Sequence, residues 1–232
     1  IRIAHNPKEM ERAFSEVSLL GKNVLVQKLI EGIHASVSLL VADKDAKTLT
    51  INEQLLGLRF LFQQEPFGYC GNMVPLCLAN SISEKCGHLT EKIALHFGLN
   101  GSNGIDLVIS KEGKPYIVEV NPRFQGTLEC VEGVLGINLV EAHINACLHG
   151  FLPTIKRKTS TFYTRLILYA PKRVIAPDLT LFREVRDVPL PRIIIEKEEP
   201  LCSIITDGKN LKLSFHKAKK LAKLIYSALL PA

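Results

Sequence analysis

Two short apolar segments, separated by a polar turn, constrain this chain more than any other feature, because each carries one carboxylate. Residues 104–109 (GIDLVI) and 115–123 (PYIVEVNPR) have the composition of β-strands, and residues 111–114 (KEGK) that of a turn. An antiparallel hairpin with a turn centred in the middle of KEGK pairs Asp106 with Glu119, with Cβ atoms about 4.5–5.5 Å apart. Like charges directly opposite each other destabilise a sheet, so the pair predicts a compensating group nearby.

Asn121 extends the pair into a candidate metal site. It lies two residues beyond Glu119, and side chains alternate along a strand, so both face the same side. Two carboxylates and an amide oxygen form a hard, all-oxygen ligand set that suits Mg²⁺ or Mn²⁺. The alternative is a register shifted by one residue, which would turn one of the acids to the other face of the sheet.

The chain has the size and composition of one large globular domain or two small ones. Of its 232 residues, 47% are hydrophobic and 22% are charged. No apolar run approaches the roughly 20 residues that span a bilayer, and the first residues lack the apolar core of a signal peptide. The six cysteines show neither a CxxC pair nor zinc-like spacing, which is typical of reduced, mostly buried thiols. We therefore expect a cytoplasmic protein without a membrane partner.

The net charge of +6 invites comparison with nucleic-acid-binding proteins. The basic residues concentrate in segment 156–158 (KRK) and in segment 209–223, where lysines interleave with leucine, isoleucine and phenylalanine as in an amphipathic element. No motif of a known binding module accompanies them. We interpret these segments as solvated faces and expect no nucleic-acid partner.

The order of predicted elements favours an α+β fold. Helices are predicted at 7–20, 81–97, 139–148 and at the C-terminus, and strands at 23–31, 36–42, 48–56, 162–169 and in the hairpin. Segment 59–77, rich in glycine, proline and aromatic residues, is interpreted as an ordered loop. Strands and helices do not alternate regularly, which argues against a Rossmann sheet.

The residues of the hairpin resemble the ATP-grasp superfamily. The match is GIDL in the first strand, followed by VEVNPR in the second. The resemblance implies an ATP-grasp fold, an antiparallel sheet with packed helices. It also implies that Asp106, Glu119 and Asn121 coordinate the Mg²⁺ (or Mn²⁺) ions that bridge the phosphates of ATP, and that Arg123 binds phosphate or substrate.

An upstream segment, VLVQKLIEG, is similar to the hinge strand of this family, whose backbone recognises adenine. The resemblance implies nucleotide-binding roles for Gln27, Lys28 and Ile30, with Gln27 in the usual acidic position and the Ile30 backbone at the adenine edge. His34 falls where many relatives carry an acidic ribose ligand, so it departs from the pattern. An ordinary core strand is the alternative interpretation of this segment.

The segments FQGTLE and FYTRL resemble the substrate side of the biotin-carboxylase-related branch of the superfamily. The resemblance implies catalytic roles for Gln125, Glu129 and Arg165 beside Arg123. The two arginines would supply positive charge to a developing anion, and Gln125 a hydrogen-bond donor. Glu129 would orient an amine or act as its base, and the alternative for it is a salt bridge to an arginine.

Further segments narrow the resemblance to the archaeal and methylotroph ATP-grasp ligases, which include the tyramine–L-glutamate ligases of methanofuran biosynthesis. They are FGYCGN, NPRFQG, DVP and EPLC. The resemblance implies an ATP-dependent carboxylate–amine ligase that forms an amide through an acyl-phosphate and releases ADP, acting on small-molecule carboxylate and amine substrates such as glutamate and tyramine. The alternatives are a bicarbonate-using carboligase and a non-catalytic nucleotide- or nucleic-acid-binding domain. Homo-oligomerisation is left open.

A polar, basic stretch near residues 153–161 divides the chain. Residues 1–155 would form a partial ATP-grasp nucleotide- and metal-binding region, and residues 156–232 a C-terminal α/β extension that completes the substrate side. Family members carry an N-terminal domain and a glycine-rich lid ahead of the hinge strand, and this chain starts near the end of that lid. We therefore expect a truncated product or a partner that supplies the missing half, and weak nucleotide binding by the chain alone.

Overall fold

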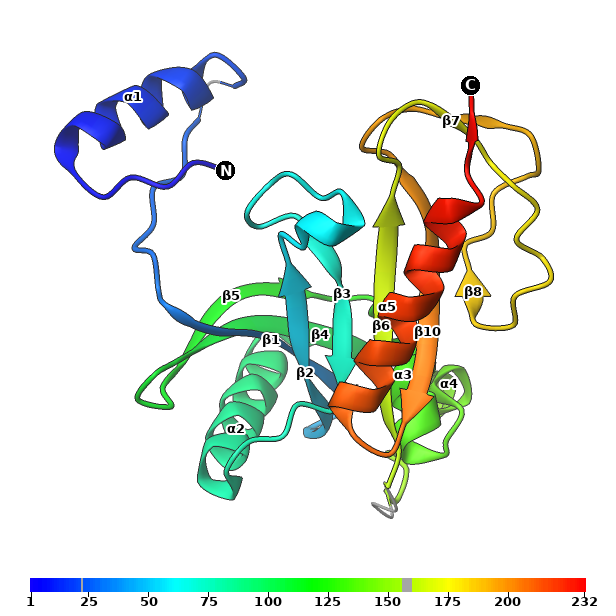
Figure 1. The fold of residues 1–232 in the computed structure, drawn as a ribbon. Coiled ribbons are helices and arrows are strands. Elements are labelled where there is room, and N and C mark those ends of the chain that lie inside the picture. The colour runs from blue at the N-terminus through cyan, green and yellow to red at the C-terminus, as the bar shows by residue number, and fades with distance from the viewer. Residues whose placement is uncertain (22, 156–159) are drawn as a thin grey trace. The chain divides into compact units, whose positions relative to one another are not determined.

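The chain forms two compact units, residues 1–31 and residues 32–232 (Figure 1). The computed structural model describes residues 1–21, 23–155 and 160–232. The basic segment 156–158 lies outside the described residues, and the boundary predicted at 155/156 stays a prediction. Within the described part of the chain, no helix is long and apolar enough to cross a membrane.

The N-terminal unit contains one described helix, α1 (Pro7–Ser18), which begins where the sequence predicted it and is capped by Asn6. The side chain of Asn6 accepts a hydrogen bond from the backbone N–H of Glu9 at 3.0 Å, and Glu9 reaches back to the N–H of His5 at 2.8 Å. Pro7 occupies the first turn, where its missing N–H costs nothing. The cap therefore fixes where the helix begins.

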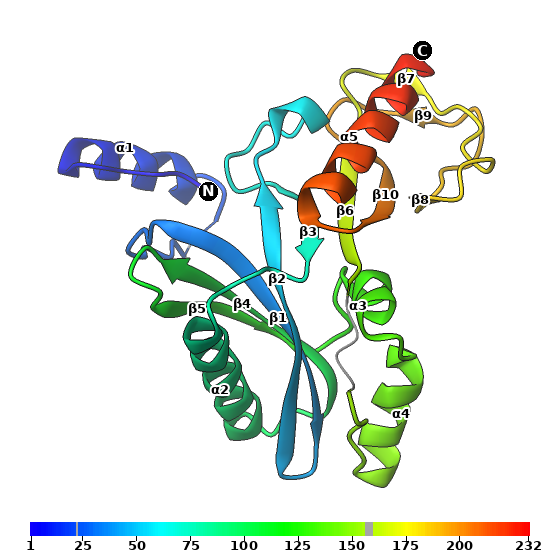
Figure 2. The same cartoon turned by 60° about the horizontal axis from the view of Figure 1, so that its bottom comes forward.

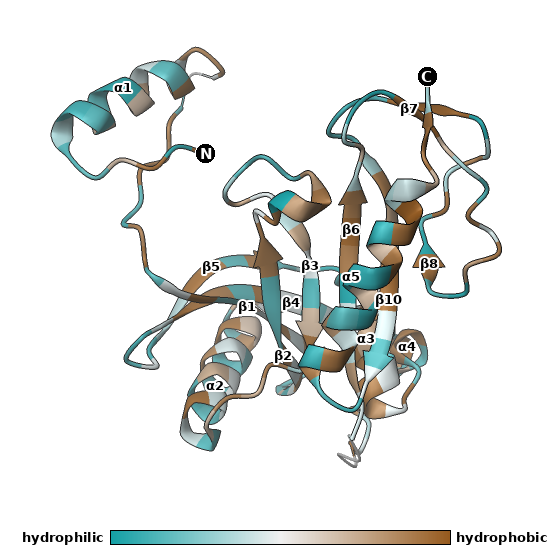
Figure 3. Ribbon diagram, in the orientation of Figure 1, coloured by the Kyte–Doolittle hydropathy of each residue, from teal (hydrophilic) through white to brown (hydrophobic). Residues whose placement is uncertain are grey.

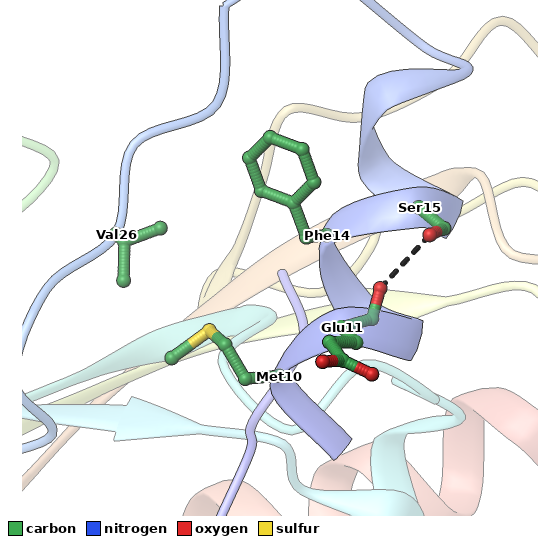
Figure 4. Close-up of a pocket in the computed structure, with 5 residues that line it drawn as sticks. All are labelled: Met10, Glu11, Phe14, Ser15 and Val26. Atoms are coloured by element: carbon green, nitrogen blue, oxygen red, sulfur yellow. Dashed lines mark hydrogen bonds between the residues drawn. The ribbon is translucent and has the colours of Figure 1, made fainter. Parts of the chain in front are cut away.

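A small open cavity of about 370 Å³ lies on one side of α1 (Figure 4). It is lined by Met10, Glu11, Phe14, Ser15 and Val26. No described residue of this unit is buried, and the Phe14 side chain remains 50% exposed. The apolar side chains of the unit thus line an open cavity without forming a closed core.

The prediction of a strand over residues 23–31 is wrong, because the first strand in the described part of the chain begins at Gly32. A β-strand is defined by hydrogen bonds to a neighbour, and segment 23–31 pairs with none of the described strands. Its apolar residues are exposed, Leu25 at 80%. An apolar sequence can favour an extended backbone, but it cannot supply the partner.

The second unit is built on an antiparallel sheet that contains eight strands within the described residues. Their spatial order is β5-β4-β1-β2-β3-β6-β10-β8. In chain order the strands are β1 (Gly32–Ala42), β2 (Asp45–Leu56), β3 (Tyr69–Val74), β4 (Gly101–Ser110), β5 (Pro115–Asn121), β6 (Phe162–Tyr169), β8 (Val185–Arg186) and β10 (Pro200–Gly208). A smaller sheet joins β7 (Val174–Ile175), β9 (Ile194–Ile195) and β11 (Leu230–Pro231).

Helices cover both faces of the large sheet (Figure 2). One face packs against α2 (Asn80–His96) and α5 (Leu211–Ser227), and the other against α3 (Leu128–Leu135) and α4 (Leu139–His149). The α5 helix buries Ala218, Ala222 and Ile225 while its lysines stay exposed, which confirms the predicted amphipathic segment (Figure 3). This layered α+β arrangement confirms the predicted fold class.

Strands β3 and β10 and helix α3 were not anticipated from the sequence. Strand β3 lies in the segment interpreted as a loop because of its glycines and aromatic residues. Gly71 has a φ of +126°, and a Cβ there would lie 1.9 Å from the backbone oxygen of Arg165 on β6. The glycine that suggested a loop is the residue that lets these two strands approach and pair.

The cysteines are free thiols, as predicted. Four of them are buried and two, Cys77 and Cys147, are exposed.

Candidate active site

Strands β4 and β5 form the predicted hairpin, and Asp106 faces Glu119 as predicted. The turn is shorter than expected, because Gly113 adopts a φ of +74° and closes a three-residue loop between Ser110 and Lys114. If the pairing that starts at this loop continued along both strands without interruption, Asp106 would lie opposite Val118. A β-bulge at this point adds one residue to β5 and brings Glu119 into line.

The half-buried Asp106 carboxyl group is electrostatically perturbed. Its pKa is raised to about 6, chiefly by burial and also by the facing Glu119, while a hydrogen bond from Gln54 and the charge of Arg123 act to lower it. Two carboxylates in contact resist simultaneous ionisation. The hairpin therefore holds more negative charge than its immediate surroundings neutralise.

Asn121 and Arg123 provide part of the compensation. The Asn121 Nδ2 donates to Glu119 Oε1 at 3.0 Å and to Asp106 Oδ2 at 3.4 Å. Arg123 Nη2 in turn donates to Asn121 Oδ1 at 3.5 Å. The three predicted ligands thus meet at one point on the sheet, with Arg123 beside them.

The donor set fits a divalent cation. The described residues contain no group of three or more His, Cys, Asp and Glu side chains placed to hold a metal, so the third protein ligand here must be the amide oxygen of Asn121. To bind a cation, Asn121 would present Oδ1 in place of the Nδ2 that now faces the carboxylates. Oxygen ligands of this kind match Mg²⁺ or Mn²⁺.

A buried polar row continues from this hairpin across the sheet. Ser36 on β1 pairs with Asp106 on one side and with Asn52 on the other. Asn52 Nδ2 donates to Ser38 Oγ at 3.1 Å, and Asn52 is fully buried. Sequence analysis missed this row, although its signal is present: polar residues at every second position of otherwise apolar strands.

The substrate-side residues gather around the loop that follows β5. Gln125 Nε2 donates to the backbone oxygen of Arg123 at 2.7 Å, and its side chain packs against Gly104, where a Cβ would lie 2.0 Å from Gln125 Cδ. Arg165, on β6, donates through Nη1 to the backbone oxygen of Gly126. These contacts place Arg165 at the end of the loop that carries Arg123 and Gln125.

Glu129 forms a salt bridge, which was the alternative left open for it. Arg186 Nε donates to Glu129 Oε2 at 2.7 Å, and both side chains are about half exposed. Whether Glu129 also orients an amine stays a prediction.

Tyr69 connects the two groups of residues. Its hydroxyl donates to Asn72 Oδ1, and burial raises its pKa. The charges of both Arg165 and Asp106 act on this hydroxyl, so Tyr69 is within electrostatic reach of the metal hairpin and of the substrate-side residues. Sequence analysis singled out the Tyr69 segment without assigning it a role.

The predicted nucleotide-binding residues are divided between the two units. His34 is on β1, two residues before Ser36 and therefore on the face that carries Asp106. Its ring packs edge-on against Phe67, and burial lowers its pKa. Gln27, Lys28 and Ile30 belong to the N-terminal unit, and their roles stay predictions.

Comparison with known proteins agrees with this geometry. A protein-family model of the ATP-grasp domain matches residues 1–127, more than half of the chain. The chain belongs to the ATP-grasp family.

Two relatives come from Methanocaldococcus jannaschii. An uncharacterised protein is 34% identical over 145 residues, covering 62% of this chain and 35% of that protein. A tyramine–L-glutamate ligase is 29% identical over 122 residues, covering 52% of this chain and 36% of that protein. The chain thus spans about a third of the length of these two relatives.

Solved structures share the ATP-grasp fold. An L-amino acid ligase from Bacillus licheniformis superposes with a TM-score of 0.72 at 16% identity, covering 97% of this chain and 60% of that protein. The biotin carboxylase domain of the Hydrogenobacter thermophilus 2-oxoglutarate carboxylase was solved with MgADP and bicarbonate. It superposes with a TM-score of 0.73 at 14% identity, covering 100% of this chain and 54% of that chain. At such identities the likeness supports the fold alone, which confirms the predicted ATP-grasp architecture.

Proposed function

We propose that the protein to which this chain belongs is an ATP-dependent carboxylate–amine ligase, which forms an amide through an acyl-phosphate and releases ADP. The observation that carries the proposal is the pairing of Asp106 with Glu119 beside Asn121, on the same sheet face as an arginine cluster. The family assignment and the ligase name of one relative support it. The name of that relative makes L-glutamate and tyramine the first substrates to test.

The hairpin would hold the metal end of the nucleotide. A bound Mg²⁺ or Mn²⁺ with ATP supplies a transferable phosphoryl group and neutralises its oxygens. Asp106 and Glu119 would hold the cation with their carboxylates, and Asn121 would complete the set through its amide oxygen. Such a cation would also offset the burial and the repulsion from Glu119 that together raise the pKa of Asp106.

The residues around the following loop would bind the reacting carboxylate. Arg123 and Arg165 can neutralise an anion, because a guanidinium presents paired donors to carboxylate or phosphate oxygens. Gln125 holds the loop closed through its hydrogen bonds to backbone oxygens, and a rotation of its amide could offer a donor to substrate. Glu129 would orient the incoming amine once released from Arg186.

The nucleotide base would be recognised by Gln27, Lys28 and the Ile30 backbone, with His34 near the ribose. This part of the proposal rests on the resemblance of the VLVQKLIEG segment to the family's hinge strand.

The test is an ADP-release assay of the complete protein with Mg-ATP, supplied in turn with amino acids, amines and bicarbonate. We expect ADP release that requires both an amino acid and an amine, beginning with L-glutamate and tyramine. Release that depends on bicarbonate and ignores amines would instead indicate a carboligase. No release under any combination, together with failure to bind Mg-ATP, would refute an enzymatic role.

Glu119→Gln tests the site assignment in the same assay. Glu119 is exposed at the hairpin, so the neutral, isosteric variant should fold normally and lose ADP release by about 1,000-fold, the worth of several kcal/mol of charge stabilisation. Glu112→Gln is the matched control, because Glu112 is an exposed glutamate in the turn of the same hairpin, where it accepts a hydrogen bond from Ser110. Metal-dependent turnover retained by Glu119→Gln would contradict the assignment.

A further inference from the structure

Four charged side chains of alternating sign gather where the loop after β5 meets Arg165 on β6. Glu129 pairs with Arg186 at 2.7 Å, and Asp187 pairs with Arg165 at 2.8 Å. Arg186 and Asp187 are neighbours in sequence, so the order along the group is acid, base, acid, base. We call these four residues the charge quartet; its formal net charge is zero.

Asp187 is held in place by only one of its two carboxylate oxygens. Its Oδ2 accepts hydrogen bonds from Arg165 Nη2 and from the hydroxyl of Ser203, which is 1% exposed. Its Oδ1 accepts none from the described residues, and the side chain is 65% exposed. One oxygen thus anchors the side chain, while the other remains available to a molecule arriving from solvent.

The backbone at Asp187 is also unusual. It adopts a φ of +53°, in the left-handed region, immediately after the short strand β8. Residues other than glycine rarely occupy that region, and aspartate and asparagine are among those that tolerate it best. The conformation turns the chain so that Arg186 reaches Glu129 and Asp187 reaches Arg165 from consecutive positions.

Arg165 retains hydrogen-bonding capacity beyond these contacts. Its Nη1 donates to the oxygen of Gly126, and its Nη2 to Asp187 and Ser203. Its Nε is buried and has no hydrogen-bond partner among the described residues. An arginine that is already neutralised and still has an unpaired buried N–H is arranged for a ligand that supplies a further acceptor.

The presence of a negative charge beside Arg165 restricts what that ligand can be. A neutral asparagine could accept the same hydrogen bonds from Ser203 and Arg165 without opposing an incoming anion. An aspartate repels a purely anionic ligand and favours one that brings its own positive charge close to its carboxylate. The ligand that satisfies both members of the pair is dipolar.

We propose that Asp187 selects an amino acid as the carboxylate substrate, by accepting a hydrogen bond from its ammonium group while Arg165 pairs with a carboxylate of the same molecule. This inference rests on the proposed ligase function and adds to it a specificity residue. Asp187 makes contact with substrate in this proposal and takes no part in bond making or breaking. The prediction is discrimination between an amino acid and the same acid without its amino group.

The test compares Asp187→Asn with the wild-type complete protein in the ADP-release assay. Asparagine keeps the shape and hydrogen-bonding oxygen of aspartate and tolerates the left-handed backbone. The probes are three pairs: L-glutamate and glutarate, L-alanine and propionate, and L-phenylalanine and 3-phenylpropionate. The wild type should prefer the amino acid in at least one pair, and Asp187→Asn should reduce that preference about tenfold, with a lower kcat/KM for the amino acid and no fall for the deaminated acid.

Asp207→Asn is the matched control. The side chain of Asp207 is 60% exposed, similar to the 65% of Asp187. It also pairs with a cationic side chain, Lys217, at 3.6 Å. It belongs to β10, two strand positions beyond the residue that pairs with Arg165. We expect this variant to leave the preference unchanged.

The other outcomes separate the inference from the proposed function. An equal fall in kcat/KM for both members of a pair would show that Asp187 only positions Arg165, and would overturn the inference while the ligase function stood. A wild type that turns over deaminated acids as readily as amino acids would also overturn it. Absence of ADP release with every acid would overturn the proposed function and this inference together.

Discussion

The metal hairpin of β4 and β5 and the charge quartet lie on one sheet face, with β1, β2 and β3 between β4 and β6, yet they handle charge in opposite ways. Asp106 and Glu119 face each other with the same sign, and the pKa of Asp106 rises to about 6 because of burial and of its neighbour. In the quartet each acid is within 2.8 Å of an arginine nitrogen. In the hairpin Arg123 compensates only part of the negative charge, whereas each acid of the quartet pairs with an arginine of its own.

The difference shows what charge patterns can reveal about ligands. Like charges held together destabilise the free protein, so an arrangement of this kind indicates an ion that is bound during function. A balanced quartet carries no such indication by itself, because exposed ion pairs form on many surfaces. For the quartet, the argument depends on the unpaired atoms, Oδ1 of Asp187 and Nε of Arg165.

The largest effect that would test this comparison is expected for Asp106→Asn, which should act in opposite directions on activity and on stability. ADP release and Mn²⁺ affinity should fall by about 100-fold or more, because a ligand charge is lost. The free energy of unfolding of the metal-free protein should rise by about 1–3 kcal/mol at pH 7, because a carboxylate with a pKa raised to about 6 no longer has to ionise inside the fold.

The pH dependence of this stabilisation follows from the direction of the pKa shift. The folded-state pKa of Asp106 lies above its ordinary value of 3.8, so the folded protein binds the proton more tightly than the unfolded chain. The contribution of this group to wild-type stability therefore decreases as the pH rises from about 4 to about 6 and then levels off. Urea unfolding of both proteins in EDTA across this range checks it, and an Asp106→Asn variant that is less stable than wild type at pH 7 would contradict the electrostatic account.

Arg165→Gln should have the opposite effect on stability. The Arg165 side chain is 20% exposed and donates to Asp187, Ser203 and the Gly126 backbone. Its loss removes these hydrogen bonds and leaves Asp187 without its cation, which should cost about 2 kcal/mol in urea unfolding.

Arg173→Gln is the control for that substitution, because Arg173 pairs with Glu196 at 3.3 Å with both side chains more than half exposed. We expect it to change stability by less than about 0.5 kcal/mol. Equal effects of the two substitutions would mean that the quartet behaves as ordinary surface charge.

The parts of the fold that local chemistry determines could be predicted from the sequence. The start of α1 follows from Asn6, Pro7 and Glu9, and strand β6 (Phe162–Tyr169) was predicted at its observed bounds. Strand β3 was not predicted because glycine residues such as Gly71 are more common in loops than in strands. Gly71 belongs to a strand because it pairs closely with β6, which the local sequence does not reveal. The strand predicted at residues 23–31 was wrong for the opposite reason: the apolar sequence favours a strand, but the segment has no strand partner among the described residues.

The site shows the same division. The pairing of Asp106 with Glu119 could be predicted because both strands are long and a single turn joins them. The predicted pair is correct, but the predicted turn was one residue too long. The three-residue loop shifts the strand register by one residue, and the bulge at Val118 restores the predicted pairing. Asp187 and Ser203 could not be placed, because they meet Arg165 only through the pairing of β6, β10 and β8, at separations of 22 and 38 residues.

The smallest effect is expected for Glu129→Gln, and it decides which of two roles this residue has. Its salt bridge to Arg186 is about half exposed, so the free energy of unfolding should change by less than about 0.5 kcal/mol. If Glu129 acts on substrate, its removal should lower kcat of ADP release about tenfold or more, whereas Arg186→Gln should leave Glu129 free and lower kcat much less. Equal losses of activity in the two variants would show that the salt bridge alone matters and would place Glu129 outside the chemistry. A larger loss of activity in Glu129→Gln than in Arg186→Gln would show that one acid of the charge quartet acts in the reaction for which the hairpin is proposed to hold the metal.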